Sequence, residues 1–135
     1  MGNSEPRVRP RPAERFAPAE DQVDLNEAVA QLWTEPNAGS HGHRQMALFH
    51  HGPATVALYC FEAGASLPDH VVDGSVTIHV LKGRLSVTTE NGRRDLPAGH
   101  LLRLAPGVVH DVEASEQSEM LLTVCVEGPN SHREA

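Results

Sequence analysis

Cysteines and aromatic residues are scarce in this chain, and a long apolar run is absent. Two cysteines are too few for a disulfide scaffold, and because Cys60 and Cys125 lie inside apolar runs we expect both to be small buried side chains. Five aromatic residues argue against a platform on which nucleic-acid bases stack. No apolar run approaches the ~20 residues needed to span a bilayer, so we expect no membrane association.

Basic residues are also in the minority. The net charge of -7 argues against nucleic-acid binding, which needs a basic surface. Residues 1–6 contain no apolar segment of the kind found in secretory signals, so the sequence predicts a cytoplasmic protein. A length of 135 residues with 39% hydrophobic and 21% charged residues is typical of one folded domain.

The N-terminal part divides into two segments. Residues 1–20 contain four prolines and four arginines, which predicts a disordered, extended arm. Residues 21–44 are predicted to hold a short helix and a linker, because Asp24 can cap a helix and Glu27 follows three positions later. The apolar face of this helix repeats at helical spacing, at Leu25, Ala28, Val29, Leu32 and Trp33. At the other end of the chain, residues 128–135 are predicted to be flexible.

From Gln45 onward the apolar residues alternate with a period of two. About eight short strands are predicted, at 46–50, 55–61, 75–81, around Leu85 and Val87, and at 93–96, 100–104, 111–114 and 120–126. Asn91-Gly92 is the strongest hairpin signal, since both residue types tolerate positive φ. Residues 45–127 are therefore predicted to form an all-β barrel or sandwich.

Two stretches of this region carry a motif. The first runs from Gly64 to Gly83 and the second from Gly99 to His110. Together they resemble the two motifs of the cupin superfamily, G-x5-H-x-H-x3,4-E-x6-G and G-x5-P-x-G-x2-H-x3-N. The matching positions are Gly64, His70 and Gly83 in the first motif, and Gly99, Gly107 and His110 in the second. The resemblance implies a small, single-domain, RmlC-like cupin with a jelly-roll β-barrel, which here follows the predicted short helix.

The sequence departs from the cupin pattern at the metal ligands. The resemblance implies three histidines and one glutamate, and it places the first and third histidines at His70 and His110. Val72 stands at the second histidine position and Val76 at the glutamate position, and a valine cannot coordinate a cation. Ala105 and Ala114 replace the proline and asparagine of the second motif. The sequence therefore predicts a degenerate metal site.

Other residues could replace the missing ligands. Catalytic metal sites typically use three protein ligands, and with His70 and His110 the third could be Asp73 or His50. His79 is expected to point away, because the period of two places it on the face opposite Val76. His41, His43, His50 and His51 form a histidine-dense segment, which is interpreted as solvated residues of loops and strand ends.

The predicted pocket is lined by His70, Val72, Val76, Ile78, Val80 and His110, an apolar wall with two polar groups. The first hypothesis is a domain that binds or senses a small molecule and needs no cofactor. The alternative is a metal-dependent cupin enzyme, of dioxygenase or isomerase type, with a non-standard ligand set and a divalent metal as cofactor. A third is a structural role, with the barrel filled by side chains. The sequence leaves open whether the protein is an enzyme, and it assigns no catalytic residue. The resemblance also implies a homodimer.

Overall fold

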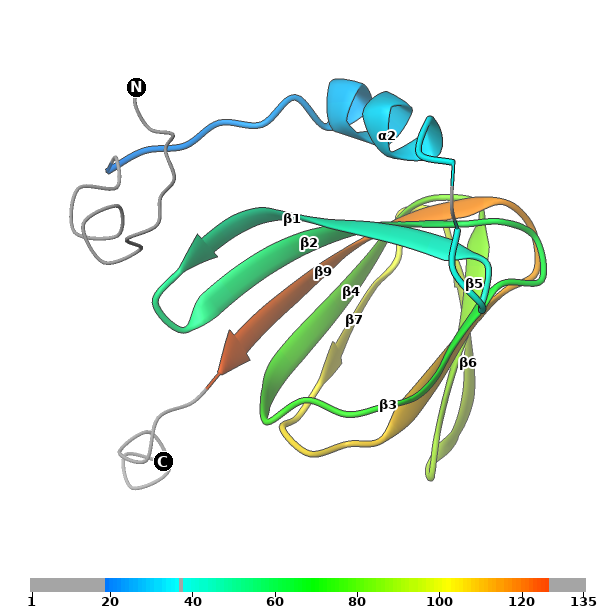
Figure 1. Cartoon of the computed structure of the whole chain (residues 1–135). Coiled ribbons are helices and arrows are strands. Elements are labelled where there is room, and N and C mark those ends of the chain that lie inside the picture. Colours follow the sequence, from blue (N-terminus) through cyan, green and yellow to red (C-terminus); the bar gives the residue numbers. More distant parts are fainter. Residues whose placement is uncertain (1–18, 37, 127–135) are drawn as a thin grey trace.

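A computed structural model describes residues 19–36 and 38–126, which form one helix and nine strands (Figure 1). The helix is α2 (Leu25–Trp33), and the strands are β1 (His43–His51), β2 (Ala54–Phe61), β3 (Ser66–His70), β4 (Gly74–Lys82), β5 (Arg84–Thr89), β6 (Gly92–Pro97), β7 (Leu101–Leu104), β8 (His110–Ala114) and β9 (Ser118–Val126). The predicted tail 128–135, and all of the predicted arm except residues 19 and 20, lie outside the described residues.

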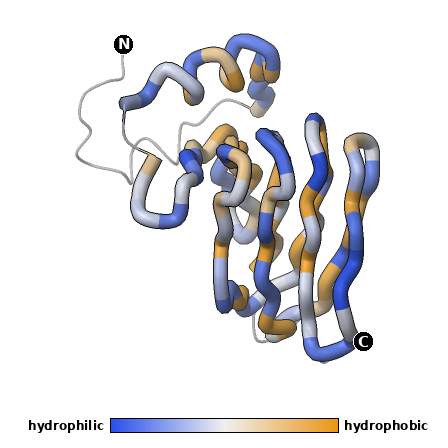
Figure 2. The backbone as a smooth tube through the Cα atoms, turned by 90° about the vertical axis from the view of Figure 1, so that its right-hand side faces the viewer, coloured by the Kyte–Doolittle hydropathy of each residue, from blue (hydrophilic) through white to orange (hydrophobic). Residues whose placement is uncertain are grey.

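The strands form two antiparallel sheets that face one another. The five-stranded sheet has the order β1-β2-β9-β4-β7, and the four-stranded sheet has the order β3-β8-β5-β6. Hydrophobic and hydrophilic residues alternate along the strands, as the tube in Figure 2 shows. This pattern places every second side chain between the sheets. The predicted all-β, jelly-roll fold is thus confirmed.

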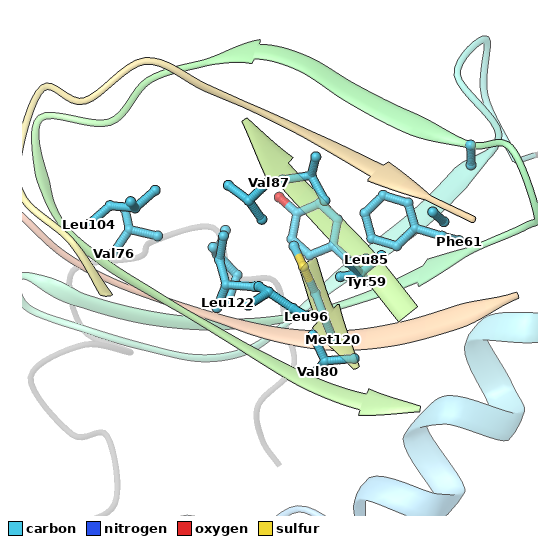
Figure 3. Close-up of a cluster of buried hydrophobic side chains, with 14 residues drawn as sticks. Tyr59, Phe61, Val76, Val80, Leu85, Val87, Leu96, Leu104, Met120 and Leu122 are labelled. Carbon is cyan, nitrogen blue, oxygen red and sulfur yellow. The ribbon is translucent and has the colours of Figure 1, made fainter. Parts of the chain in front are cut away.

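Strand β4 shows the alternation most clearly. Val76, Ile78 and Val80 are buried, whereas Thr77 and His79 on the opposite face are only partly buried. The outward direction predicted for His79 is therefore correct. The inward residues of β4 pack against inward residues of the other strands, including Tyr59, Phe61, Leu85, Val87, Leu96, Leu104, Met120 and Leu122 (Figure 3).

Helix α2 covers the outer face of the five-stranded sheet. It begins as predicted, because the Asp24 carboxylate accepts a hydrogen bond from the backbone N–H of Glu27. Leu32 packs with outward-facing residues of β2 such as Leu58 and Cys60. The Trp33 indole donates a hydrogen bond of 3.1 Å to Glu119 on β9, which ties the helix end to the sheet. Over the described ranges, no helix has the length and apolar character needed to cross a membrane.

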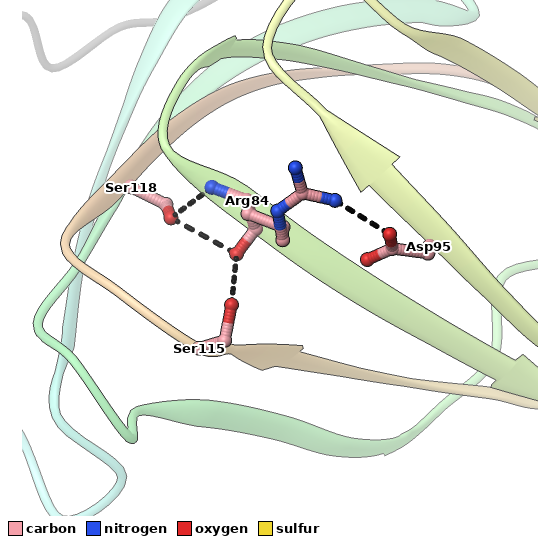
Figure 4. A network of polar contacts seen from close by, with 4 residues as sticks. All are labelled: Arg84, Asp95, Ser115 and Ser118. Atoms are coloured by element: carbon pink, nitrogen blue, oxygen red, sulfur yellow. Dashed lines mark hydrogen bonds and ion pairs between the residues drawn. The ribbon is translucent and has the colours of Figure 1, made fainter.

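A polar network links the two sheets at one end of the barrel (Figure 4). The backbone N–H of Arg84 donates to the Ser118 hydroxyl at 2.9 Å, and that hydroxyl also lies 3.2 Å from the Arg84 carbonyl. The Ser115 hydroxyl donates to the same carbonyl, and the Arg84 guanidinium pairs with Asp95. These contacts join the start of β5 to the segment that leads into β9.

Three expectations about the strands and the cysteines differ from the structure. Strand β3 was not predicted, because Pro68 and Asp69 are unfavourable in strands. It forms nonetheless at the edge of its sheet, where proline is tolerated, with an irregular register between Leu67 and His70. The hairpin between β5 and β6 exists, but Gly92 already pairs with Thr89, so Glu90 and Asn91 form its turn.

The third difference concerns a cysteine. Cys60 is buried as expected, but Cys125 is exposed. Cys125 lies near the end of β9, where the strand leaves the core, and its apolar neighbours in the sequence gave no sign of this.

Candidate functional site

The two motif histidines come together at the end of the barrel opposite the Arg84 network. His70 is the last residue of β3, and His110 is the first residue of β8. They are direct partners in the antiparallel pairing of these strands. The loops beside them are also joined, because the backbone N–H of Gly107 donates to the carbonyl of Val72 at 3.0 Å. Backbone pairing thus holds both histidines in place.

The ring of His110 lies inside the barrel. His110 alternates with Asp111 along β8 and shares the buried face with Val112, and only 2% of its surface is exposed. Its Nδ1 lies 3.0 Å from the carbonyl oxygen of Val108. Since a carbonyl can only accept, Nδ1 must carry the hydrogen of this bond. Its Nε2 is buried and has no hydrogen-bond partner among the described residues.

The ring of His70 lies beside that of His110. The ring centroids are 5.3 Å apart, with an interplanar angle of 62°. His70 is half-buried, and neither of its ring nitrogens hydrogen-bonds to another described residue. Burial, followed by the neighbouring His110 and His43, lowers the pKa of His70 below its usual 6.5. The ring is therefore held in its neutral form at neutral pH.

Two further polar residues belong to this interior, and the sequence interpretation missed both. His43, interpreted as a solvated loop residue, is the first residue of β1. Its ring centroid lies 5.7 Å from those of Tyr59 and Phe61, and its Nδ1 lies 3.2 Å from the Ser66 carbonyl oxygen. The alternation of β1 gave no signal for His43, because it shares its face of the strand with the exposed Gln45.

Tyr59 is the second missed residue. It lies in the core among apolar side chains, and in Figure 3 its hydroxyl oxygen points toward Val87 of the facing sheet. Burial raises the pKa of Tyr59 above its usual 10, so the phenol keeps its proton. Within the described part of the chain the hydroxyl makes no hydrogen bond. Besides its apolar walls, the interior thus contains the neutral phenol of Tyr59 and the neutral imidazole of His70.

The predicted pocket wall divides into two groups. Val76, Ile78 and Val80 are almost fully buried and pack within the core, whereas Val72 is partly buried and lies in the loop after β3. The expectation that Val72 and His70 share one face of a strand is therefore wrong, because the strand ends at His70. The two valines nevertheless lie at the same end of the barrel as the histidines. β3 ends at His70 and β4 begins at Gly74, so the short connection that contains Val72 leads directly to Val76.

Burial of the inward apolar side chains decreases toward this end. Phe61, Leu85 and Met120, near the opposite end, are fully buried. Near the histidines, Val72, Val108 and Val124 are only partly buried. A cleft of about 420 Å³ adjoins the histidine end, and it is lined by Asp69, Thr88, Thr89, Glu90, Pro106, Gly107, Val108, Val109, His110 and Asp111. Of the predicted pocket residues, this cleft includes His110.

The donor atoms do not match a complete metal site. His110 Nε2 is a suitable ligand atom, and His70 is its neighbour. Asp73, a proposed third ligand, is exposed, and His50 is bound to the hydroxyl of Thr55 at 2.6 Å. Across residues 19–36 and 38–126, no three His, Cys, Asp or Glu side chains are grouped so as to hold a metal ion. Two imidazoles are fewer than the three protein ligands typical of a catalytic site.

Comparison with family models identifies the family of this chain. Residues 57–127 match the family model described as "Cupin domain". A search of curated proteins found no match.

Solved structures share the fold. A cupin superfamily protein from Desulfitobacterium hafniense has a TM-score of 0.65 and 19% identity, covering 82% of this chain and 94% of that one. KdgF from Halomonas sp. has a TM-score of 0.60 and 18% identity over 70% of this chain and 88% of its own. Salicylate 1,2-dioxygenase from Pseudoaminobacter salicylatoxidans has a TM-score of 0.61 and 14% identity over 75% of this chain and 30% of its own.

Proposed function

The chain belongs to the cupin family, and from this premise we propose that it binds a small molecule at the histidine end of its barrel, without a complete metal site. The observation that carries the proposal is the pair of His70 and His110, which face one another across β3 and β8 while valines stand at the two other ligand positions. A cupin barrel hosts many functions, so the argument rests on these side chains.

Unpartnered polar atoms support a ligand at this place. His110 Nε2, both ring nitrogens of His70 and the Tyr59 hydroxyl lack hydrogen-bond partners among the described residues. Of these atoms His110 Nε2 is buried, and leaving a buried polar group without a partner costs roughly 1–3 kcal/mol. A small molecule that makes a hydrogen bond with Nε2 recovers this energy on binding, and His70 and Tyr59 offer it further polar contacts. Partly buried apolar residues near them, such as Val72 and Val108, suit the apolar part of such a molecule.

The second candidate is a metal-dependent cupin enzyme. Two observations favour it: one structure with this fold is a dioxygenase by name, and the free His110 Nε2 is an atom that can ligate a cation. His70 and His110 would hold the ion, which would act as a Lewis acid when bound. The donor set described above is incomplete for such a site, so we derive no reaction from it.

Two measurements on untagged protein separate the candidates. Elemental analysis after extensive dialysis is expected to find far less than one metal per chain. A mixture of small organic fragments is then added to the metal-free protein, and the imidazole NMR signals of His70 and His110 are expected to shift with at least one fragment. Near one equivalent of metal, lost in the variant His110→Ala, would establish the enzyme candidate instead. A metal-free protein whose histidine signals respond to no fragment would overturn the binding proposal and favour a structural role.

A further inference from the structure

The hydrogen bonding of His110 indicates which chemistry the ligand must have. Because Nδ1 carries the hydrogen that it donates to the Val108 carbonyl, the form of the ring with a single N–H presents a lone pair at Nε2. Nε2 is therefore an acceptor, and it is buried without a partner among the described residues. A group that meets it must donate a hydrogen bond. A carboxylate, a ketone or an ether offers only acceptors, so these groups leave Nε2 unsatisfied.

The cleft beside His110 argues against a negatively charged ligand. Asp69, Glu90 and Asp111 supply three carboxylates to its lining, and no lysine or arginine is among the lining residues. One oxygen of Asp111 accepts a hydrogen bond of 2.5 Å from the backbone N–H of Asp69. An anion in this cleft would be repelled by these carboxylates, and no basic side chain of the lining would offset the repulsion.

The surroundings of Nε2 argue for an apolar ligand body. The core residue nearest along β8 is Val112, and Val108 packs against the same core from the preceding loop. Leu67 is opposite Val112 in the pairing of β3 with β8. In pockets that are mostly aliphatic, a few directed polar atoms such as His110 Nε2 set the orientation of the ligand.

We infer that the ligand of this cupin is an uncharged, largely apolar small molecule whose hydroxyl group donates a hydrogen bond to Nε2 of His110. The inference rests on the proposed function, because it names the ligand class for the same site. It does not require a metal or a chemical step. The inference distinguishes this protein from one that binds organic anions, a function that the same fold could also support.

Three probes of similar size test the inference: phenol, which donates a hydrogen bond, toluene, which has the same shape but no donor, and benzoate, which is an anion. Affinities are measured by NMR titration of the natural protein and of the variant His110→Leu. The matched control is His79→Leu, the same substitution on the outward face of β4. We expect the phenol-to-toluene affinity ratio to fall roughly tenfold in His110→Leu and to stay unchanged in His79→Leu. Comparing ratios removes the difference in hydrophobicity between the probes.

A second readout does not depend on the folding of a variant. In the natural protein, phenol is expected to shift the ¹⁵N signal of His110 Nε2, whereas toluene leaves it in place and benzoate does not bind. The inference is overturned if phenol and toluene act alike in both experiments, or if benzoate binds more tightly than phenol. If phenol fails but other fragments shift the His70 and His110 signals, the inference fails and the proposed function stands. If no fragment shifts them, both fail.

Discussion

His70 and His110 are direct partners across two antiparallel strands, and their imidazole rings meet nearly edge to face at 5.3 Å. They belong to two different motifs and lie forty positions apart in the chain. In a sheet, directly opposite residues have their Cβ atoms within about 5.5 Å, so the pairing alone brings the rings together. The site is therefore a property of the β3–β8 register.

The first prediction concerns pH. The pKa of His70 is lowered by burial and then by His110 and His43, so the folded protein protonates His70 less readily than the unfolded chain does. Above about pH 6.5 both states are neutral there and pH has no effect through this residue. As the pH falls below that value, the unfolded chain gains the proton first, so stability decreases until the folded pKa is passed.

Urea unfolding between about pH 8 and about pH 5 measures this effect. The variant His70→Leu is expected to lose less stability over this range than the natural protein. It lacks the imidazole whose protonation favours the unfolded chain. His100→Leu, at an exposed turn position, is the control and is expected to keep the natural slope. Equal slopes in all three proteins would contradict the prediction.

The second prediction concerns the two valines at the missing ligand positions. The double variant Val72→His, Val76→Glu is expected to bind a divalent cation that the natural protein binds weakly, because it restores the four-ligand set of the family. Without metal the variant is expected to be less stable, since Val76 is buried and a glutamate there would be desolvated. Isothermal titration with Zn²⁺ or Mn²⁺ measures the binding.

Val72→His, Thr77→Glu is the matched control for this gain. It carries the same new residue types, but Thr77 lies on the outward face of β4. The control is expected to bind metal no better than the natural protein. Equal gains in both double variants would show that the restored site plays no part.

The third prediction concerns Gly83, which connects β4 to β5 with a φ of 85°. A Cβ at this position would lie within 2.3 Å of both the Gln117 carbonyl oxygen and the Ser118 hydroxyl oxygen. Gly83→Ala is therefore expected to lower the free energy of unfolding by about 2 kcal/mol or more. Gly99→Ala is the control, because Gly99 has a φ of 90° but nothing near its Cβ position. A loss in Gly83→Ala no larger than in Gly99→Ala would show that the contacts to the 117–118 segment do not matter.

The fourth prediction concerns the two thiols. Burial, and then the charge of Glu119, raises the pKa of Cys60 to about 12, although Arg44 lowers it slightly. Cys125 is exposed. Since the thiolate is the reactive form, iodoacetamide is expected to label one cysteine of the folded protein and both of the unfolded protein. Mass spectrometry of Cys125→Ser should then find no label in the folded state; rapid labelling of that variant would mean that Cys60 is accessible.

The fifth prediction is the homodimer implied by the family resemblance. Strands β1 and β7 are edges of the five-stranded sheet, and Leu101 on β7 is 66% exposed. An exposed apolar edge strand is stabilised when another chain covers it. Sedimentation at micromolar concentration is expected to show a species of twice the chain mass, and Leu101→Lys is expected to weaken it. A single species with the mass of one chain would reject the dimer.

Local patterns in the sequence were enough to predict much of the fold. The alternation of Val76, Ile78 and Val80 with Thr77 and His79 predicted the inward and outward faces of β4, because side chains in a strand point to opposite faces at every step. The spacing of Asp24 and Glu27 predicted the helix start, since capping involves residues only three positions apart. The spacing of glycines and histidines in the two motifs predicted the cupin fold and singled out His70 and His110.

Only the tertiary structure decided which residues surround those histidines. β3 contains Pro68 and Asp69, and it forms because β8 pairs with it and not because of local preference. His43 and Tyr59 enter the interior through the pairing of β1 with β2, and Cys125 is exposed because β9 leaves the core there. These outcomes depend on which distant strands pair and in which register, and a one-residue shift would turn each side chain to the other face. A periodic pattern within one strand contains no information on that register, so the polar interior of this barrel could be known only from the folded chain.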